Sequence, residues 1–126
     1  MKRTSIHMEF LFRASPNILY KFLTTPSCLI RWFCDQVDIQ NDTFTFDWSG
    51  SEEVAYLIED IEEELLRFQW ESAEGTDEYL TFKISTSPVT RETILEISDY
   101  CDDDEADDQK QLWNSQMETL RAAMGG

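Results

Sequence analysis

The 126-residue chain is long enough for one domain and too short for two of ordinary size. Hydrophobic residues make up 41% of it and aromatic residues 13%, which excludes a disordered polypeptide and predicts a substantial core. The 26 acidic residues against 10 Lys and Arg give a formal net charge of -16, so we expect neither nucleic acid nor an anionic membrane as a partner. Solubility is the simplest explanation of the excess acid.

The cysteines and the apolar stretches indicate a cellular compartment. Cys28, Cys34 and Cys101 follow no metal-ligand spacing and cannot all pair, so we expect reduced thiols in a cytoplasmic protein. Polar residues interrupt the N-terminal segment, which therefore does not resemble a signal peptide. No apolar run approaches the ~20 residues of a membrane-spanning helix, so we expect no membrane insertion.

The first elements are predicted to be a strand and two short helices. Apolar residues alternate with polar ones from Ile6 to Phe12, which is typical of a strand with one buried face. Ser15-Pro16 and Thr25-Pro26 each join an N-cap residue to a proline suited to the first helical position. Apolar stripes over 18–23 and 29–33 complete the two helices.

From residue 35 to residue 99 the apolar residues recur with a period of two. We expect an antiparallel meander of about six strands with short turns, including one at Gly50-Ser51. The acidic stretch 59–64 is interpreted as a solvated hairpin end. The predicted strands cover residues 37–39, 43–48, 54–58, 66–70, 80–84 and 91–100.

The tail is predicted to be one long helix. Trp113, Met117, Leu120 and Met124 form a single apolar stripe at helical spacing. About 20 residues at 1.5 Å each would span ~30 Å, enough to cross a small sheet. We therefore expect this helix to lie across the hollow side of the meander.

The acidic run 102–108 precedes that helix and invites comparison with a calcium-binding loop. Counted from Asp102, the sixth position is Asp107 where such a loop needs glycine, and the twelfth is Trp113 where it needs glutamate. Acidic side chains are favoured at a helix N-terminus, so we interpret the run as a helix start and expect no metal.

The predicted order is β-α-α, about six strands, then a helix, in a single domain over residues 1–126. This is an α+β fold in which a curved antiparallel sheet is wrapped around a long C-terminal helix. Several motifs follow one another in this order: Ala14-Ser15-Pro16, Trp32-Phe33, Phe44-x-Phe46-x-Trp48-x-Gly50, Ile58-Glu59-x-Ile61, Phe68-x-Trp70 and Trp113-x-x-x-Met117-x-x-Leu120.

With these motifs the chain resembles the START-like superfamily, also called SRPBCC or helix-grip proteins, which includes polyketide cyclases. Trp32-Phe33 and Trp48-x-Gly50 resemble most the subgroup named after the activator of the heat-shock protein 90 ATPase. The resemblance implies a domain whose interior between sheet and helix can hold an apolar ligand.

No catalytic residue, metal or cofactor is predicted. His7 is the sole histidine and falls on the polar face of the first strand, so we expect it to face solvent. The chain has neither a glycine-rich phosphate loop nor a G-x-S-x-G motif. Glu96 shares a strand with apolar residues and would anchor the polar end of a ligand if it faced the interior.

The aromatic side chains at strand and helix spacing leave two interpretations open. They form either a packed core or the lining of a ligand pocket. As a pocket they predict a non-catalytic module that binds an apolar small molecule or lipid in an enclosed cavity of at least ~300 Å³. The predicted cavity-lining residues are Phe46, Trp48, Phe68, Trp70 and Phe82 from the sheet and Trp113, Met117 and Leu120 from the helix.

Two other functions remain open. A protein-interaction module, either a chaperone ATPase co-factor or a homodimer, predicts an exposed apolar patch and no sizeable cavity. A cyclase-type enzyme requires an acid that points inward and has a raised pKa, for which Glu96 is the first candidate.

Overall fold

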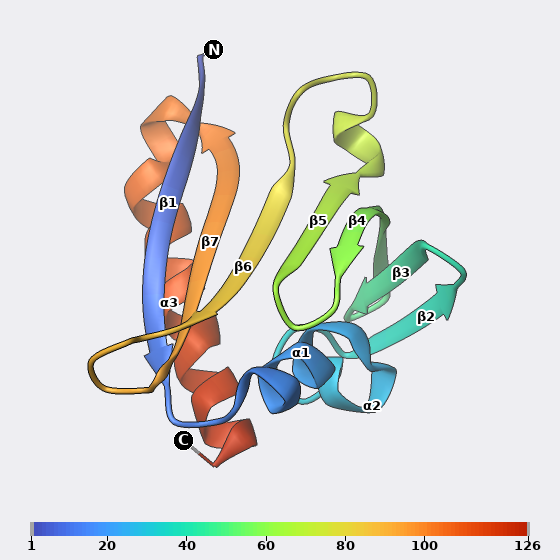
Figure 1. Ribbon diagram of the computed structural model, residues 1–126. Coiled ribbons are helices and arrows are strands. Elements are labelled where there is room, and N and C mark those ends of the chain that lie inside the picture. Colours follow the sequence, from blue (N-terminus) through green and yellow to red (C-terminus); the bar gives the residue numbers. More distant parts are fainter. Residues whose placement is uncertain (1, 126) are drawn as a thin grey trace.

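The computed structural model describes residues 2–125 and contains one seven-stranded antiparallel sheet of order β1-β7-β6-β5-β4-β3-β2 (Figure 1). The predicted order of elements is confirmed. The elements are β1 (Arg3–Phe12), α1 (Pro16–Thr24), α2 (Pro26–Leu29), β2 (Gln36–Gln40), β3 (Thr43–Trp48), β4 (Ser51–Ile61), β5 (Leu65–Trp70), η1 (Glu71–Ala73), β6 (Leu80–Thr86), β7 (Thr93–Asp102), η2 (Asp103–Glu105) and α3 (Ala106–Met124).

The two short helices begin where the sequence predicts. The Ser15 hydroxyl accepts a hydrogen bond from the Ile18 amide at 3.3 Å and caps α1, while prolines open both helices. The second helix is shorter than its apolar stripe suggested, because it ends at Leu29. Trp32 and Phe33 lie in the turn that follows, and both side chains are buried.

The hairpins differ from the prediction by small shifts. The β3–β4 turn is formed by Ser49 and Gly50, with φ angles of 53° and 87°, one residue earlier than expected. Such positive angles suit a tight hairpin turn and favour glycine. In the acidic stretch, β4 continues to Ile61, so only residues 62–64 form the solvated turn.

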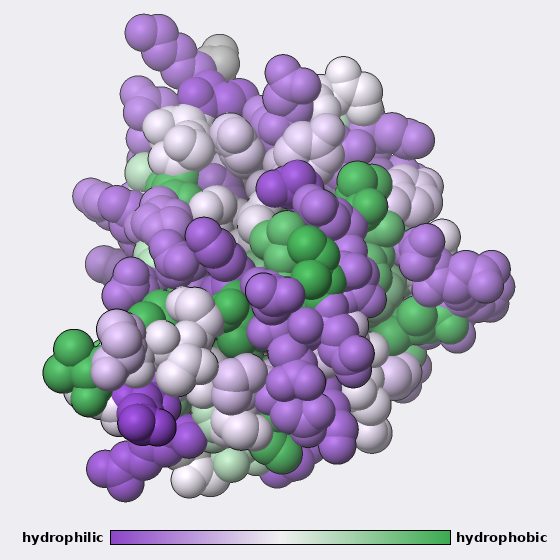
Figure 2. Space-filling model, in the orientation of Figure 1, coloured by the Kyte–Doolittle hydropathy of each residue, from purple (hydrophilic) through white to green (hydrophobic). Residues whose placement is uncertain are grey.

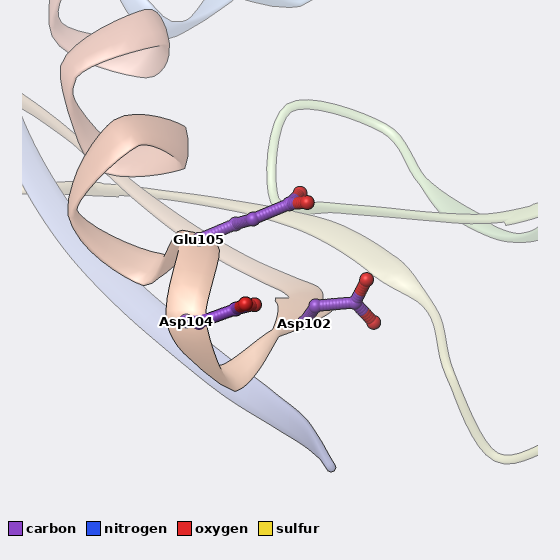
Figure 3. Close-up of side chains that lie close together, drawn as sticks. All are labelled: Asp102, Asp104 and Glu105. Carbon is purple, nitrogen blue, oxygen red and sulfur yellow. The ribbon is translucent and has the colours of Figure 1, made fainter. Parts of the chain in front are cut away.

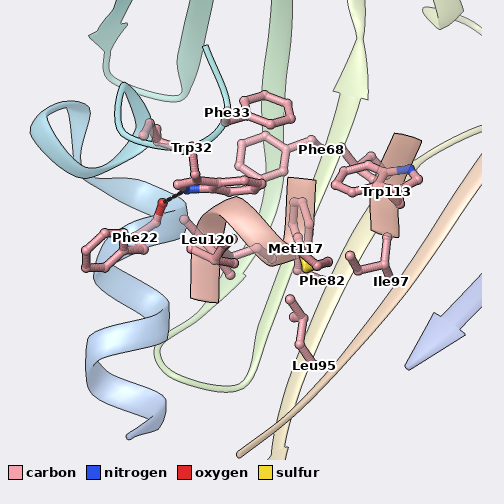
Figure 4. Packing of buried hydrophobic residues seen from close by; sticks show 14 of the residues in the cluster. Phe22, Trp32, Phe33, Phe68, Phe82, Leu95, Ile97, Trp113, Met117 and Leu120 are labelled. Atoms are coloured by element: carbon pink, nitrogen blue, oxygen red, sulfur yellow. Dashed lines mark hydrogen bonds between the residues drawn. The ribbon is translucent and has the colours of Figure 1, made fainter. Parts of the chain in front are cut away.

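Helix α3 lies on the concave side of the sheet, as predicted. Trp113, Met117 and Leu120 are at most 3% exposed and face β6 and β7, where Phe82 and Ile97 are also buried (Figure 4). Burying this stripe removes large apolar side chains from water, which is the main force holding helix to sheet.

Helices α1 and α2 close one end of the concave side, near the C-terminal end of α3 (Figure 1). Their Leu19, Leu23 and Leu29 are at most 2% exposed. The Arg31 guanidinium donates a hydrogen bond to the Ala123 carbonyl at 2.8 Å and ties this end to α3.

The outside of the molecule is mostly hydrophilic in the view of Figure 2, in keeping with the acidic composition. Among residues 2–125, no helix combines the length and the apolar character needed to cross a membrane.

Candidate functional site

The deep interior between sheet and helix is filled by side chains. The space bordered by Leu23, Trp32, Phe46, Phe68 and Phe82 measures about 10 Å³, roughly what one water molecule needs. The expected enclosed cavity of at least ~300 Å³ is therefore wrong for this part of the molecule. The rings themselves occupy it, with centroids 5.1 Å apart for Phe44–Phe68 and 5.9 Å apart for Phe82–Trp113.

A larger space of about 450 Å³ is a groove open to the surface, and Phe33, in the turn that follows α2, borders it. It runs between the N-terminal half of α3 and the sheet. Its apolar lining consists of Phe33, Trp48, Trp70, Leu112 and Trp113, and its polar lining of Glu53, Asp99, Gln109 and Gln116.

The sheet topology brings the groove residues together. Strands β3, β5 and β7 run in the same direction because each is separated from the next by one antiparallel neighbour. Their C-terminal ends therefore lie at the same end of the sheet. Trp48 is the last residue of β3, Trp70 is the last residue of β5, and Asp99 lies near the end of β7. Glu53 lies beside them because β4, which runs in the opposite direction, begins at this end of the sheet.

A hydrogen bond and ring contacts hold Trp48 in the aromatic wall of the groove. The indole N–H of Trp48 donates to the Phe33 carbonyl at 2.6 Å, and the Phe33 ring meets the Trp48 ring edge-on at 5.4 Å. Trp48 and Trp70 have centroids 6.3 Å apart and are only partly buried. Trp48 and Trp70 thus present apolar surface to solvent at the groove.

Asp99 is the inward-facing carboxylate of the groove and is 8% exposed. It accepts hydrogen bonds from the Trp113 indole N–H at 3.0 Å, the Gln109 amide at 3.3 Å and the Tyr100 backbone N–H at 2.8 Å. Within residues 2–125 it forms no ion pair with a basic side chain. Three neutral donors therefore stabilise this buried carboxylate.

Glu96 would anchor the polar end of a ligand only if it faced the interior, and the structure places it on the other face. Leu95 and Ile97 are fully buried, so the alternation of β7 points Glu96 outward. The same alternation points Asp99 inward, on the side of Leu95 and Ile97. The spacing of these three residues in the sequence is the signal that could have identified it. Glu96 therefore anchors nothing in the groove.

On the outer face, Glu96 lies beside His7. The His7 Nε2 is 3.5 Å from a Glu96 carboxylate oxygen and its Nδ1 is 3.1 Å from the Ser98 hydroxyl. The His7 side chain is 58% exposed, which confirms that it faces solvent. None of these three residues lines the groove.

The eight predicted cavity-lining residues do not form one site. Trp48, Trp70 and Trp113 border the groove. Met117 and Leu120 are at most 1% exposed and contribute packing instead. Phe46, Phe68 and Phe82, again with Trp70, border the 10 Å³ space. The groove is also lined by residues outside the predicted set: Phe33, Leu112, Glu53, Asp99, Gln109 and Gln116.

The acidic run before α3 gathers Asp102, Asp104 and Glu105, whose carboxylate oxygens lie within 4.8 Å of one another (Figure 3). The Arg3 guanidinium binds Asp102 at 3.0 Å, and η2 leads directly into α3. The interpretation of this run as a helix start is confirmed.

The comparisons with known proteins agree with the fold. The whole chain, residues 1–126, matches the family model of the START-like superfamily domain. A Bacteroides fragilis protein solved by NMR is 37% identical, with a TM-score of 0.70 over 97% of this chain and 91% of that one. The Aha1 dimer from Colwellia psychrerythraea is 17% identical, with a TM-score of 0.82 and 96% of each chain covered.

DynU16, from the dynemicin biosynthetic locus, is 15% identical with a TM-score of 0.80, over 96% of this chain and 47% of its own. The comparison with curated proteins finds no match. Since the family model spans every residue of the sequence, the chain belongs to the START-like superfamily.

Proposed function

We propose that this protein is a non-catalytic binding module that holds an apolar small molecule or lipid chain in the groove. The groove itself carries the proposal, because about 450 Å³ lies within the range of small-molecule sites, whereas the packed interior offers no comparable space. Binding there would bury apolar ligand surface against Trp48, Trp70 and Trp113, at ~25 cal/mol per Å².

The rigidity of the groove favours such a role. Trp48 is fixed by its hydrogen bond to Phe33, and Trp113 by its hydrogen bond to Asp99. Rings already held in place lose little conformational freedom when a ligand arrives, which lowers the cost of binding. Since the groove is open at the surface, a ligand enters without displacing the core.

A fluorescence titration with N-phenyl-1-naphthylamine, a neutral apolar dye, tests the proposal. We expect saturable binding to the wild-type protein and loss of it in Gln116→Trp, which fills the groove. Glu118→Trp is the matched control, because residue 118 lies on the same helix, is exposed and lies outside the groove. Equal binding by both variants would place the dye elsewhere and contradict the proposal.

A homodimer is the second candidate function. The filled interior is what a protein-interaction module predicts, and Leu112 at the groove is 51% exposed. If a second copy or a chaperone covers the groove, Leu112→Glu will abolish that association. Sedimentation equilibrium of the wild-type protein and this variant distinguishes a dimer from a monomer, and a monomeric wild-type protein would remove the homodimer.

A further inference from the structure

We infer that the groove selects ligands that carry a positive charge beside their apolar part, such as substituted ammonium compounds. This inference rests on the proposed function and specifies its ligand class. It comes from the charges and rings of the groove, which recognise such a group in two complementary ways.

The polar lining is entirely acidic or neutral. Glu53 and Asp99 contribute carboxylates, Gln109 and Gln116 contribute amides, and no Lys, Arg or His is among the lining residues that the structure describes. Arg3 borders a smaller pocket that Asp99 also borders. Its guanidinium is engaged by Glu78 at 2.7 Å and Asp102 at 3.0 Å, so it does not neutralise the groove.

The apolar lining includes three indole rings, from Trp48, Trp70 and Trp113. The face of an aromatic ring carries negative electrostatic potential, and tryptophan attracts a cation more strongly than phenylalanine or tyrosine does. An ammonium group bearing methyl groups gains from the rings of Trp48 and Trp70, which are only partly buried, without needing hydrogen bonds. Its charge is then balanced by the carboxylates at the same site.

The buried carboxylate makes this preference specific. Asp99 is 8% exposed and its donors are all neutral, so its negative charge is not cancelled by a neighbour. A ligand carboxylate or phosphate at this place would face like charge in a partly desolvated site. The net charge of -16 also repels anions, and it opposes a second copy of the chain as the occupant.

Three probes that share one ring system and differ in charge provide the test: (2-naphthylmethyl)trimethylammonium, 2-naphthylmethanol and 2-naphthoate. By isothermal titration calorimetry we expect the cation to bind about tenfold more tightly than the neutral alcohol. The anion should bind more weakly than the alcohol, because both carboxylates repel it.

Variants locate the effect. Asp99→Asn and Glu53→Gln should each reduce the advantage of the cation over the alcohol several-fold. Glu53 is exposed, so its variant folds even if Asp99→Asn does not. Glu118→Gln removes the same charge from an exposed position on α3 outside the groove. It should leave the ratio of the cation's affinity to the alcohol's affinity unchanged. A ratio lowered equally by Glu118→Gln would show general surface attraction and overturn the inference.

The remaining outcomes separate the inference from the proposed function. If the alcohol binds in the groove and the cation binds no more tightly, the charge preference is wrong while the binding module stands. If none of the three probes binds, and the neutral dye does not bind either, both are overturned.

Discussion

The two ends of the concave surface are built from the same kinds of residue and differ in what fills them. At the closed end, α1, α2 and the C-terminal half of α3 seal the sheet with fully buried leucines such as Leu19 and Leu120. At the open end, the N-terminal half of α3 stands clear of Trp48 and Trp70 and leaves about 450 Å³. The same sheet and helix therefore form a packed core at one end and an open groove at the other.

Two leucines on α3 should show the largest difference between the ends. Leu120→Ala removes a side chain that is 0% exposed and should lower the free energy of unfolding by about 2–5 kcal/mol. Leu112→Ala removes one that is 51% exposed and should cost less than about 1 kcal/mol. Urea unfolding of both variants measures the contrast, and equal losses would mean that the groove end is packed like the core.

Trp113 should give the next largest effect, because it joins the two ends. Trp113→Phe keeps a ring against Phe82 but removes the N–H that donates to Asp99 at 3.0 Å. A buried carboxylate that loses a donor should cost about 1–3 kcal/mol of stability. In an Asp99→Asn background the cost should shrink, since the acceptor is then uncharged. An undiminished cost in the double-mutant cycle would show that ring packing alone explains the loss.

A third effect appears only at alkaline pH. Burial, followed by the charges of Asp35 and Asp47, raises the pKa of the Cys34 thiol to about 11 from its ordinary 9.0. The folded state therefore retains a proton that the unfolded state releases, so stability is complete below pH 9 and falls as pH rises towards 11. Cys34→Ala should flatten this decline in pH-dependent unfolding. An identical decline in the variant would assign it to other groups.

The smallest effect concerns the closed end. The Tyr20 hydroxyl on α1 donates to Asp60 at 2.6 Å, and burial together with this bond raises the tyrosine pKa. Tyr20→Phe should cost about 0.5–1.5 kcal/mol in urea unfolding. It should leave dye binding at the groove unchanged, and a loss of binding would show that the two ends are coupled.

The sequence was sufficient for the fold because the fold follows from periodicity. Apolar residues alternate with polar ones between residues 35 and 99, and the structure has strands there. The apolar stripe of Trp113, Met117 and Leu120 is buried in the structure, as helical spacing predicts. The β3–β4 turn lies at Ser49-Gly50, one residue before its predicted position. The turn needs two adjacent residues with positive φ angles, and residue types alone do not reveal which two these are.

The site was harder to predict, since periodicity shows which side chains face inward but not how far apart the two layers stand. Phe46 and Trp48 have the same pattern on one strand, yet Phe46 is 4% exposed and Trp48 borders the groove. Glu96 and Asp99 are three residues apart on β7 and therefore lie on opposite faces of the sheet, and the packing of α3 decides which face is buried. The distance between the layers and the choice of buried face come from the tertiary structure.

The indole N–H signals of the four tryptophans test the central claim most directly. Trp48, Trp70 and Trp113 line the groove, while Trp32 is 7% exposed in the packed interior and donates to the Phe22 carbonyl at 2.8 Å. In a two-dimensional ¹H–¹⁵N NMR titration with N-phenyl-1-naphthylamine, the three groove signals should shift and that of Trp32 should stay in place. A shift of the Trp32 signal without those of Trp48 and Trp113 would contradict the account, because the ligand would then occupy the interior.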